Sequence, residues 1–169
     1  AAFTFFVLNE DVDAAVHADY LCNEYGLDTI STGAVIAFAM DCYDNGIISR
    51  EEADGLDLSW GNAGTMIEMV KRICRREGIG RVLGEGVRRA SQEIGKGSDR
   101  LAIHVKGLEG PAHDPRSAKT LAVAYGLGNR GMCHIHPLEM GFYDALNNDF
   151  GLIPYGLPDP ETVDRYAEE

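Results

Sequence analysis

Apolar residues recur at helical spacing through most of the first hundred positions. From Asp11 to Tyr25 they lie three or four residues apart, and Gly26 is expected to end that helix. After a polar link, a second helix is expected from about Thr32 to Asn45, and its first half, GAVIAFAM, is apolar throughout. A helix that is apolar on every side has to be buried on most of its surface. We therefore expect the second helix to lie inside the core.

Two capping boxes predict further helical starts, because each pairs a hydroxyl side chain with a glutamate three residues later. Ser49 and Glu52 predict a brief helical turn, and Thr65 and Glu68 predict the start of a longer helix that ends at Gly78. The apolar face of this longer helix is formed by Met66, Met69, Val70, Ile73 and Cys74. We interpret its two methionines as core residues and not as part of a cofactor site.

The next periodic segment predicts a single helix from about Gly80 to Ile94. Residues 101–105 alternate weakly and favour an extended segment, but no series of alternating strands is present that could form a real sheet. Three shorter helices are expected beyond it, at LAVAYGL (121–127), at 140–150 and from 160 onward. The chain is therefore predicted to be all-α and multi-helical.

Length and composition indicate a globular protein. With 169 residues, 45% of them hydrophobic, the chain can form one sizeable core or two small ones. Its longest apolar run, Gly33 to Met40, is far shorter than the about 20 residues that span a bilayer. Residues 1–13 carry acids and no base, unlike a signal peptide, so a cytoplasmic location is expected. The sequence opens without methionine and its last helical pattern is cut short, so we expect a piece of a longer polypeptide.

Charge is distributed unevenly along the chain. The net charge is −12 over residues 1–70, +7 over 71–131 and −7 over 132–169. The acidic total argues against nucleic acid as the main partner, whereas the basic middle would suit a small anionic ligand such as a phosphate-bearing cofactor. Solvated helix faces are the other explanation for several of these bases, namely Arg75, Arg76, Arg88 and Arg89.

The four cysteines are widely separated, at Cys22, Cys42, Cys74 and Cys133. Their spacing contains no CxxC pair of the kind found in zinc sites, redox motifs or local iron–sulfur sites. Three of them fall inside helical patterns and are expected to be core thiols. Cys133 is the exception, because its neighbours in the sequence are polar.

The stretch from Gly107 to Pro137 holds much of the candidate chemistry. Its polar residues are Asp114, Arg116, Lys119, Asn129, Arg130, Cys133, His134 and His136. Gly126, Gly128 and Gly131 form the GxGxxG pattern of a dinucleotide-binding turn, but they follow a predicted helix where such a turn must follow a strand. These glycines remain suited to another anion, because successive exposed backbone amides form an anion-binding concavity.

Two histidines in this stretch have two alternative interpretations. His134 and His136 would project to the same side of an extended segment, and Glu139 could reach the same place, which is the geometry of a chelating site in a metal-dependent hydrolase. No hydrophobic strand precedes them, however, and a pair of structural histidines is the favoured interpretation of the pattern alone. The link at 23–31 is ambiguous in the same way: Asp28 can cap the second helix, but it lies at least three residues before the apolar run begins.

Five blocks taken together resemble one family, in the same order and with similar gaps. They are CNEYGLDTISTGAVIAFAMDCYDNGII, LDLSWGN, REGIGRVLGEGVRRAS, HVKGLEGPAHDPRSAK and YGLGNRGMCHIHP. The family is that of the aldehyde ferredoxin oxidoreductases, which are tungsten enzymes. The resemblance implies the two helical C-terminal domains of such a protein. Residues 1–105 would be part of its second domain, and residues 106–169 would start its third domain with the DPR and NRGxCH blocks.

The resemblance also implies cofactors and partners. Members of the family hold tungsten through the dithiolenes of two pterins of the molybdopterin type, beside a 4Fe-4S cluster. They oxidise aldehydes to carboxylic acids and pass the electrons to ferredoxin or another electron-transfer subunit, and relatives reduce the ring of benzoyl-CoA. A homodimer is one assembly consistent with the resemblance, and neither a membrane nor a nucleic acid is expected as a partner.

Site residues follow from the resemblance position by position. Family members touch one pterin through a DxxGLD or DxxGLC segment, which corresponds here to Asn23, Gly26, Leu27, Asp28 and Thr29. Asn23 stands where the family usually has aspartate, so it keeps the acceptor oxygen and loses the charge. His134 would be the proton-handling group near the metal, and His136 would lie near the pterin. A histidine suits proton transfer because its ordinary pKa of about 6.5 is close to neutral pH.

Several residues of the family's site are not in this sequence. The cluster-binding CxxCxxxC and a catalytic glutamate would lie before it, and a second DxxGLC would lie after it. We therefore expect no metal ligand in this chain, no cofactor bound by it alone and no activity of the isolated fragment. The alternatives are an aryl-CoA reductase subunit of the same family and a non-catalytic helical module that has lost the site.

Overall fold

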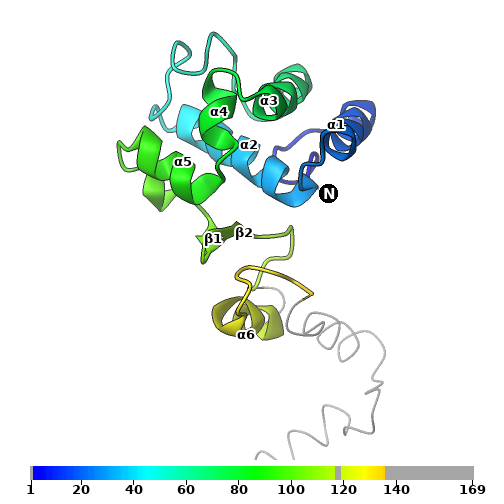
Figure 1. Ribbon diagram of the computed structural model, residues 1–169, viewed down its shortest axis with the longest axis vertical. Helices are drawn as coiled ribbons and strands as arrows, with labels where there is room; N and C mark the ends of the chain where they lie inside the picture. Colours follow the sequence, from blue (N-terminus) through cyan, green and yellow to red (C-terminus); the bar gives the residue numbers. More distant parts are fainter. Residues whose placement is uncertain (1, 117–118, 136–169) are drawn as a thin grey trace, which may run out of the picture. The chain divides into compact units, whose positions relative to one another are not determined.

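The computed structural model describes residues 2–116 and 119–135, and this part of the chain is helical (Figure 1). The helices are α1 (Val12–Tyr25), α2 (Thr29–Asp44), α3 (Ala63–Arg75), α4 (Ile79–Leu83), α5 (Val87–Ile94) and α6 (Lys119–Leu127), with a 3-10 turn η1 at Ser98–Arg100. The strands β1 (His104–Val105) and β2 (Leu108–Glu109) form a short antiparallel hairpin with His104 opposite Glu109. The predicted all-α class is confirmed. By its contacts the chain divides into two compact units, residues 1–112 and 113–169.

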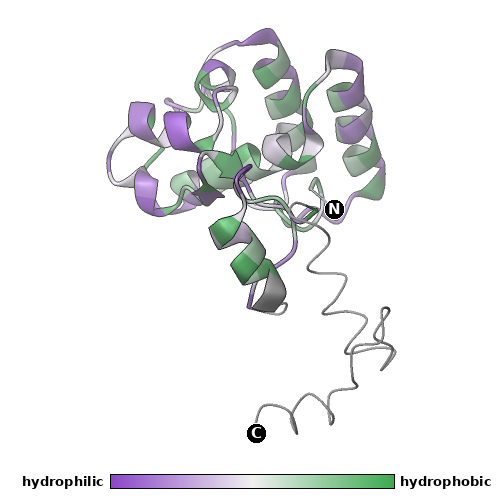
Figure 2. Ribbon diagram, turned by 60° about the horizontal axis from the view of Figure 1, so that its bottom comes forward, coloured by the Kyte–Doolittle hydropathy of each residue, from purple (hydrophilic) through white to green (hydrophobic). Residues whose placement is uncertain are grey.

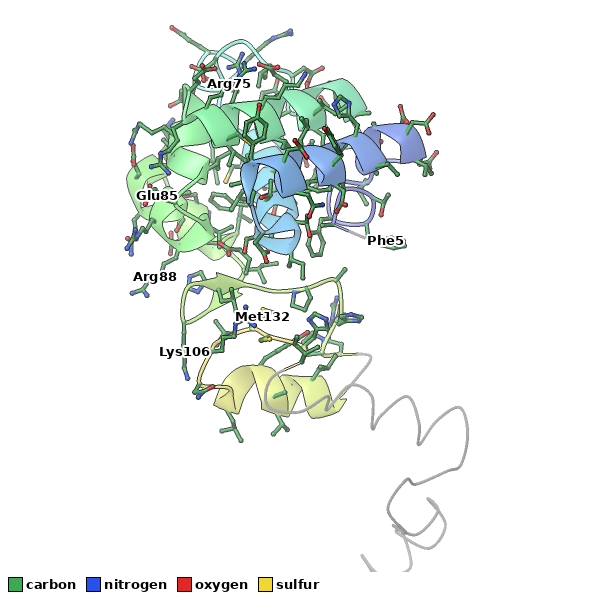
Figure 3. The ribbon with its side chains drawn as sticks, turned by 45° about the vertical axis from the view of Figure 1, so that its right-hand side comes forward. Phe5, Arg75, Glu85, Arg88, Lys106 and Met132 are labelled. Atoms are coloured by element: carbon green, nitrogen blue, oxygen red, sulfur yellow. The ribbon has the colours of Figure 1, made fainter. Side chains whose placement is uncertain are left out.

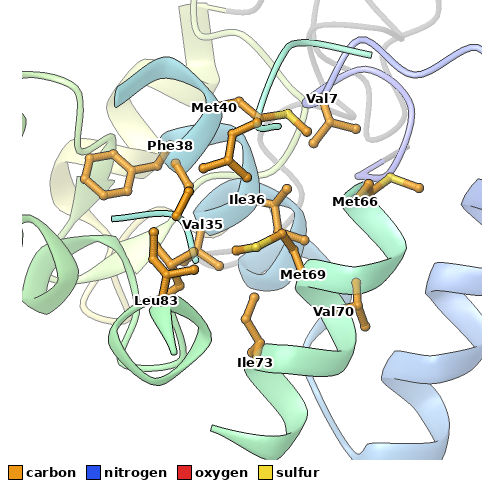
Figure 4. Close-up of a cluster of buried hydrophobic side chains, with 14 of the residues drawn as sticks. Val7, Val35, Ile36, Phe38, Met40, Met66, Met69, Val70, Ile73 and Leu83 are labelled. Atoms are coloured by element: carbon orange, nitrogen blue, oxygen red, sulfur yellow. The ribbon is translucent and has the colours of Figure 1, made fainter. Parts of the chain in front are cut away.

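Helix α2 is the centre of the first unit. It contacts α1, α3, α4, α5 and β2, so its apolar half is surrounded by other elements. Ile36 and Met40 are completely buried and lie beside Met69 and Leu83 from the neighbouring helices (Figure 4). The prediction of a core helix from the run GAVIAFAM is thus confirmed.

Helices α3 and α5 are amphipathic, with apolar residues on one side and charged residues on the other (Figure 2). Met66 and Met69 are fully buried, as expected for core residues. The arginines in the sequence 75–89 lie on the outer surface, and Arg75 and Arg88 point away from the helices (Figure 3). Arg76 and Arg89 both pair with Glu85. These bases belong to solvated helix faces, which is the simpler of the two interpretations of the charge pattern.

Helix α2 begins three residues before the predicted start. Asp28 adopts extended backbone angles, φ −68° and ψ 120°, and its Oδ1 accepts a hydrogen bond from the Ser31 N–H at 2.7 Å. Aspartate is among the best residues for this position because its oxygen satisfies a backbone donor that has no helical partner. The interpretation of Asp28 as an N-cap is therefore correct. Gly26 ends α1 with φ 71°, also as predicted.

One predicted capping box is present and the other is wrong. The Ser49 N–H donates to Glu52 Oε2 at 2.9 Å and the Glu52 N–H donates to Ser49 Oγ at 3.2 Å. Helix α3, in contrast, is capped by Asn62, whose Oδ1 accepts from the Thr65 N–H at 3.1 Å. An asparagine three residues earlier caps as well as a threonine, so the helix starts sooner. It also ends earlier than Gly78, because Arg76 takes the left-handed conformation with φ 57°.

The single helix predicted over residues 80–94 is wrong, because the chain forms two helices there, α4 and α5. The break falls at Gly86, whose φ of 82° is incompatible with a right-handed helix. Each of the two helices is capped from a distance: Asp54 Oδ2 accepts from the Ile79 N–H at 2.7 Å, and Glu109 Oε1 accepts from the Val87 N–H at 2.7 Å. The hairpin that carries Glu109 accounts for the extended segment expected at 101–105.

The second unit contains α6, which includes the predicted helix at 121–127. Leu121, Ala124 and Tyr125 are buried, while Val123 and Leu127 are exposed, so the helix is buried along one side only. The helices predicted at 140–150 and from 160 onward lie outside the described residues. Among the helices that are described, none is both long enough and apolar enough to cross a membrane.

Candidate functional site

Five residues that the sequence predicts to contact a cofactor, Asn23, Gly26, Leu27, Asp28 and Thr29, lie in the last turn of α1, the loop that follows it and the start of α2, a segment called here the 23–29 loop. The Leu27 N–H donates to the Cys22 carbonyl at 2.8 Å, which closes the end of α1 around Gly26. A side chain added at Gly26 would meet no atom within 4 Å, so this glycine lies on open surface. Leu27 and Thr29 are half-buried. The loop is thus firmly attached at both ends, and its glycine backbone is accessible.

Asn23 and Asp28 supply the exposed polar atoms of this loop. Asn23 Nδ2 donates to the Asp19 carbonyl at 2.9 Å and to Asp19 Oδ2 at 3.2 Å. Asp28 Oδ1 accepts from the Ser31 N–H, whereas within the described residues Asp28 Oδ2 and Asn23 Oδ1 accept no hydrogen bond. Two acceptor oxygens on an exposed turn suit a ligand that presents N–H groups, as the amino-pyrimidinone ring of a pterin does. The loop residues therefore fit the group that the sequence implies.

A groove of about 410 Å³ adjoins this loop and opens between the N-terminal segment, α1 and the start of α2. It is lined by Ala2, Phe3, Thr4, Val12, Ala15, Val16, Asp19, Thr29 and Ile30. Most of the lining is apolar, with Thr4, Asp19 and Thr29 as polar exceptions. Thr29 is the one predicted contact residue that borders this groove.

The cysteines of the first unit do not fit an iron–sulfur cluster. Cys22 and Cys42 are buried in the apolar core, and burial raises the pKa of each thiol to about 11. A cluster ligand has to be a thiolate, which such a site disfavours. Cys74 is half-buried, and desolvation raises its pKa as well. Across residues 2–116 and 119–135, no three histidine, cysteine or acidic side chains come together as metal ligands would.

His134 lies in the second unit, half-buried, with its ring against that of His113. The two ring centroids are 4.9 Å apart and the rings are tilted by 34°. The pKa of His134 is lowered, first by burial and second by the positive charge that His113 can carry. A histidine in this state is a neutral imidazole near pH 7, which can accept a proton. The partners in the alternative metal site, His136 and Glu139, lie outside the described residues, as does the predicted pterin contact at His136.

His113 is a site residue that the sequence analysis did not identify. Tyr125, buried on α6, donates from its hydroxyl to the His113 carbonyl at 3.1 Å and so fixes the backbone at this position. Burial raises the pKa of Tyr125, which keeps the hydroxyl protonated as the donor. The sole sequence signal for His113 is its place directly before the DPR block.

The DPR block forms a local ion pair. Arg116 Nε donates to both carboxylate oxygens of Asp114 at 3.0 Å, and the Arg116 N–H donates to Asp114 Oδ1 at 2.8 Å. The hydrogen bonds from Arg116 lower the pKa of Asp114 to about 2. Cys133 is buried despite its polar sequence neighbours and accepts from Arg130 Nη1 at 3.5 Å.

The glycine pattern of this unit does not form a dinucleotide-binding turn. Gly126 is part of α6, and the Gly128 N–H donates to the Ala124 carbonyl at 2.8 Å at the end of that helix. Only Gly131, with φ 110°, uses the conformational freedom of glycine. The pattern follows a helix, as the sequence predicted.

The sequence-predicted residues therefore occur in two groups. Asn23, Gly26, Leu27, Asp28 and Thr29 lie together where α1 ends and α2 begins in the first unit, and His134 is paired with His113 in the second unit. The first group offers acceptor oxygens and an accessible backbone, and the second offers a neutral imidazole.

Known proteins resemble the chain both in sequence and in structure. A tungsten-containing aldehyde ferredoxin oxidoreductase of Pyrococcus furiosus is 41% identical over 126 residues, which are 74% of this chain and 20% of that protein. The WOR-like subunit of an aliphatic sulfonate oxidoreductase from the same organism is 38% identical over 125 residues, 70% of this chain and 20% of its own length. This chain thus spans about a fifth of the length of these relatives.

A solved structure has the same fold. The active-site complex BamBC of benzoyl coenzyme A reductase, in complex with 1,5-dienoyl-CoA, matches with a TM-score of 0.63 and 26% sequence identity, over 94% of this chain and 22% of the other. The family profile described as aldehyde ferredoxin oxidoreductase, domains 2 and 3, matches residues 1–169. Because that match extends over every residue of the sequence, the chain belongs to the aldehyde ferredoxin oxidoreductase family, in the region of its domains 2 and 3.

Proposed function

We propose that the chain is the helical part of a tungsten-pterin oxidoreductase that oxidises aldehydes to carboxylic acids and passes the electrons to ferredoxin. The observation that carries this proposal is the 41% identity to a tungsten-containing aldehyde ferredoxin oxidoreductase. In the complete protein we assign residues 1–105 to the second domain and 106–169 to the start of the third. We expect a cytoplasmic enzyme, with a homodimer as one assembly to test.

Residues 23–29 would hold a pterin in this enzyme. Asp28 Oδ2 and Asn23 Oδ1 would accept hydrogen bonds from its N–H groups, and the bare backbone of Gly26 would let a flat ring approach. Because Asp28 Oδ1 also caps α2, the carboxylate is already oriented before a ligand binds. His136, which lies outside the described residues, is proposed as a further pterin contact. The tungsten-pterin centre supplies the two-electron acceptor when it is bound.

His134 would handle the proton of the reaction. Oxidation of a hydrated aldehyde to a carboxylic acid releases two electrons and two protons, so a base near the substrate lowers the barrier. The half-buried His134 imidazole is neutral and can take one proton on a ring nitrogen. Burial also limits the access of bulk water to this proton. The 4Fe-4S cluster of the complete enzyme would be held by residues outside this chain, since Cys22 and Cys42 do not suit it.

A second function is favoured by one observation, the likeness to the active-site complex of benzoyl coenzyme A reductase. An aryl-CoA reductase would use the same helical framework and the same histidine, but His134 would then have to be protonated first and would deliver that proton to the ring as an imidazolium. The two functions differ in substrate, so substrate assays separate them.

The test uses the complete polypeptide that carries this chain, expressed without oxygen in the presence of tungstate. We expect about one tungsten per polypeptide and aldehyde-dependent reduction of ferredoxin or a viologen dye. His134→Gln should lose most of the activity and keep the tungsten, whereas His17→Gln, on the exposed face of α1, should change neither. Oxidation of a dienoyl-CoA without aldehyde oxidation would favour the second function. A polypeptide with neither tungsten nor either activity would overturn both.

A further inference from the structure

The rings of His113 and His134 form a pair that is held from both sides. Their centroids are 4.9 Å apart. His113 is fixed through its carbonyl, which accepts the hydroxyl proton of Tyr125. His134 follows Cys133, which is buried and whose N–H donates to the Gly131 carbonyl at 2.9 Å. The pair is therefore a built feature of the second unit.

Two imidazoles at this distance interact through their charges. When one ring is protonated, a proton on the other brings two positive charges within about 5 Å, which costs about 1 kcal/mol in water and more in a partly buried site. The doubly protonated state is thus disfavoured, and a charge on His113 lowers the pKa of the half-buried His134 in addition to the effect of burial.

Other charged groups of the described part of this unit are engaged elsewhere. Asp114 pairs with Arg116, and Arg130 donates to Cys133 Sγ. Tyr125 is a neutral donor to a backbone carbonyl. Burial is the main cause that lowers the pKa of His134, and the charge of His113 is the second cause. No carboxylate of the described residues of this unit contacts His134 to oppose it.

We propose that His113 is a positioning residue for His134: near neutral pH the two rings together carry at most one positive charge, and His113 keeps the His134 imidazole neutral and in place. The inference rests on the proposed function, in which His134 accepts a proton from the hydroxyl of the hydrated aldehyde. In that step one O–H bond breaks and one N–H bond forms on His134. The histidines themselves are neither oxidised nor reduced. His113 does not contact the substrate and acts through His134.

The test measures the protonation of His134 without relying on catalysis. In the complete polypeptide, diethyl pyrocarbonate modifies an imidazole only in its neutral form, and tandem mass spectrometry that distinguishes His134 from His136 gives the rate of modification of His134 at each pH. His113→Phe keeps an aromatic ring in place and removes the charge. We expect this variant to react about two- to fourfold more slowly than wild type at His134 near pH 6, and equally fast near pH 8. His17→Phe, far along the chain on α1, should leave both rates unchanged.

A second variant and a second readout keep the result interpretable. His113→Asn tests the same loss of charge if the phenylalanine variant does not fold. In the tungsten-loaded enzyme, the acid limb of the kcat/KM profile should move to higher pH in His113→Phe, in the same direction as the modification profile. An unchanged modification profile at His134 would show that the charge of His113 does not affect the protonation of His134, which would overturn the proposal. A shifted modification profile with an unchanged activity profile would overturn the positioning role. If the polypeptide holds no tungsten, the proposed function fails. The modification profile still decides whether the charge of His113 affects the protonation of His134.

Discussion

Glu109 Oε1 accepts a hydrogen bond from the backbone N–H of Val87 at 2.7 Å and so caps helix α5 from a strand 22 residues away in sequence. The carboxylate is buried, with 5% of the residue exposed. It takes the place of a local capping side chain, because Gly86 directly before the helix has none. A side chain at Gly86 would lie 2.8 Å from Glu109 Oε1, so glycine leaves the room that the carboxylate needs. The hairpin and α5 are therefore coupled through one hydrogen bond.

Replacing Glu109 with alanine should destabilise the protein. The substitution removes the cap of α5 and leaves the buried Val87 N–H without a partner, each of which costs about 1 kcal/mol or more. We expect the free energy of unfolding to fall by about 2 to 3 kcal/mol, measured by urea unfolding. Glu93→Ala removes an exposed partner of Arg81 and should leave the midpoint near that of wild type. Equal losses in the two variants would contradict the capping role of Glu109.

Gly80 should not tolerate even a methyl group. A side chain there would lie 2.4 Å from the carbonyl carbon of Arg72, where α4 passes against the backbone of α3. Since backbone cannot move aside as a flexible side chain can, Gly80→Ala should lower the free energy of unfolding by about 3 kcal/mol in a urea titration. At Gly64, inside α3, an added methyl group would lie no closer than 3.7 Å to its nearest neighbour, Asn62 Oδ1, so Gly64→Ala should be neutral or slightly stabilising. A neutral Gly80→Ala would mean that α3 and α4 are further apart than described.

The helices that follow local rules were predictable from the sequence. The apolar run of α2 and the glycine after Tyr25 gave the correct core helix and the correct end of α1, because both depend on neighbouring residues. The break between α4 and α5 was missed, because it depends on carboxylates from Asp54 and Glu109 that no local pattern reveals. The predicted capping box at Thr65 was wrong because Asn62, three residues earlier, is an equally suitable N-cap. The helix begins after Asn62.

The candidate site was predictable in part. The residues at 23–29 could be proposed because a family motif covers them within one short segment, although the sequence pattern alone left the capping role of Asp28 open. His113 could not be found in this way, since its importance arises from a ring contact with a residue 21 positions later. A contact of this kind depends on the tertiary structure, which brings distant residues of the chain together. It can be identified only in the folded structure.

Alkaline pH should weaken the fold through two buried thiols. Burial raises the pKa of Cys22 and Cys42 to about 11, whereas a thiol in an unfolded chain titrates at about 8.5. Between these values the folded state binds more protons than the unfolded state, so their contribution to stability is complete below about pH 8.5 and is lost as the pH rises toward 11. Urea unfolding at pH 7 and pH 10 should show this loss. In the double variant Cys22→Ala and Cys42→Ala the difference between the two pH values should be smaller, and an unchanged difference would exclude the thiols as its cause.

The two roles of Asp28 can be separated by one pair of substitutions. Asp28→Ser keeps an oxygen that can accept from the Ser31 N–H, but it removes the carboxylate, whereas Asp28→Ala removes both. Because serine is nearly as good an N-cap as aspartate, we expect Asp28→Ser to unfold close to wild type and Asp28→Ala to lose about 1 kcal/mol in urea unfolding. If the second carboxylate oxygen also holds a pterin, both variants of the complete polypeptide should retain less pterin and tungsten after purification. Thr29→Ser, which keeps the hydroxyl next to the carboxylate, should retain both. Full retention of pterin in Asp28→Ser would show that the aspartate serves the helix alone and that the cofactor contact of this loop has to come from Asn23 or the backbone at Gly26.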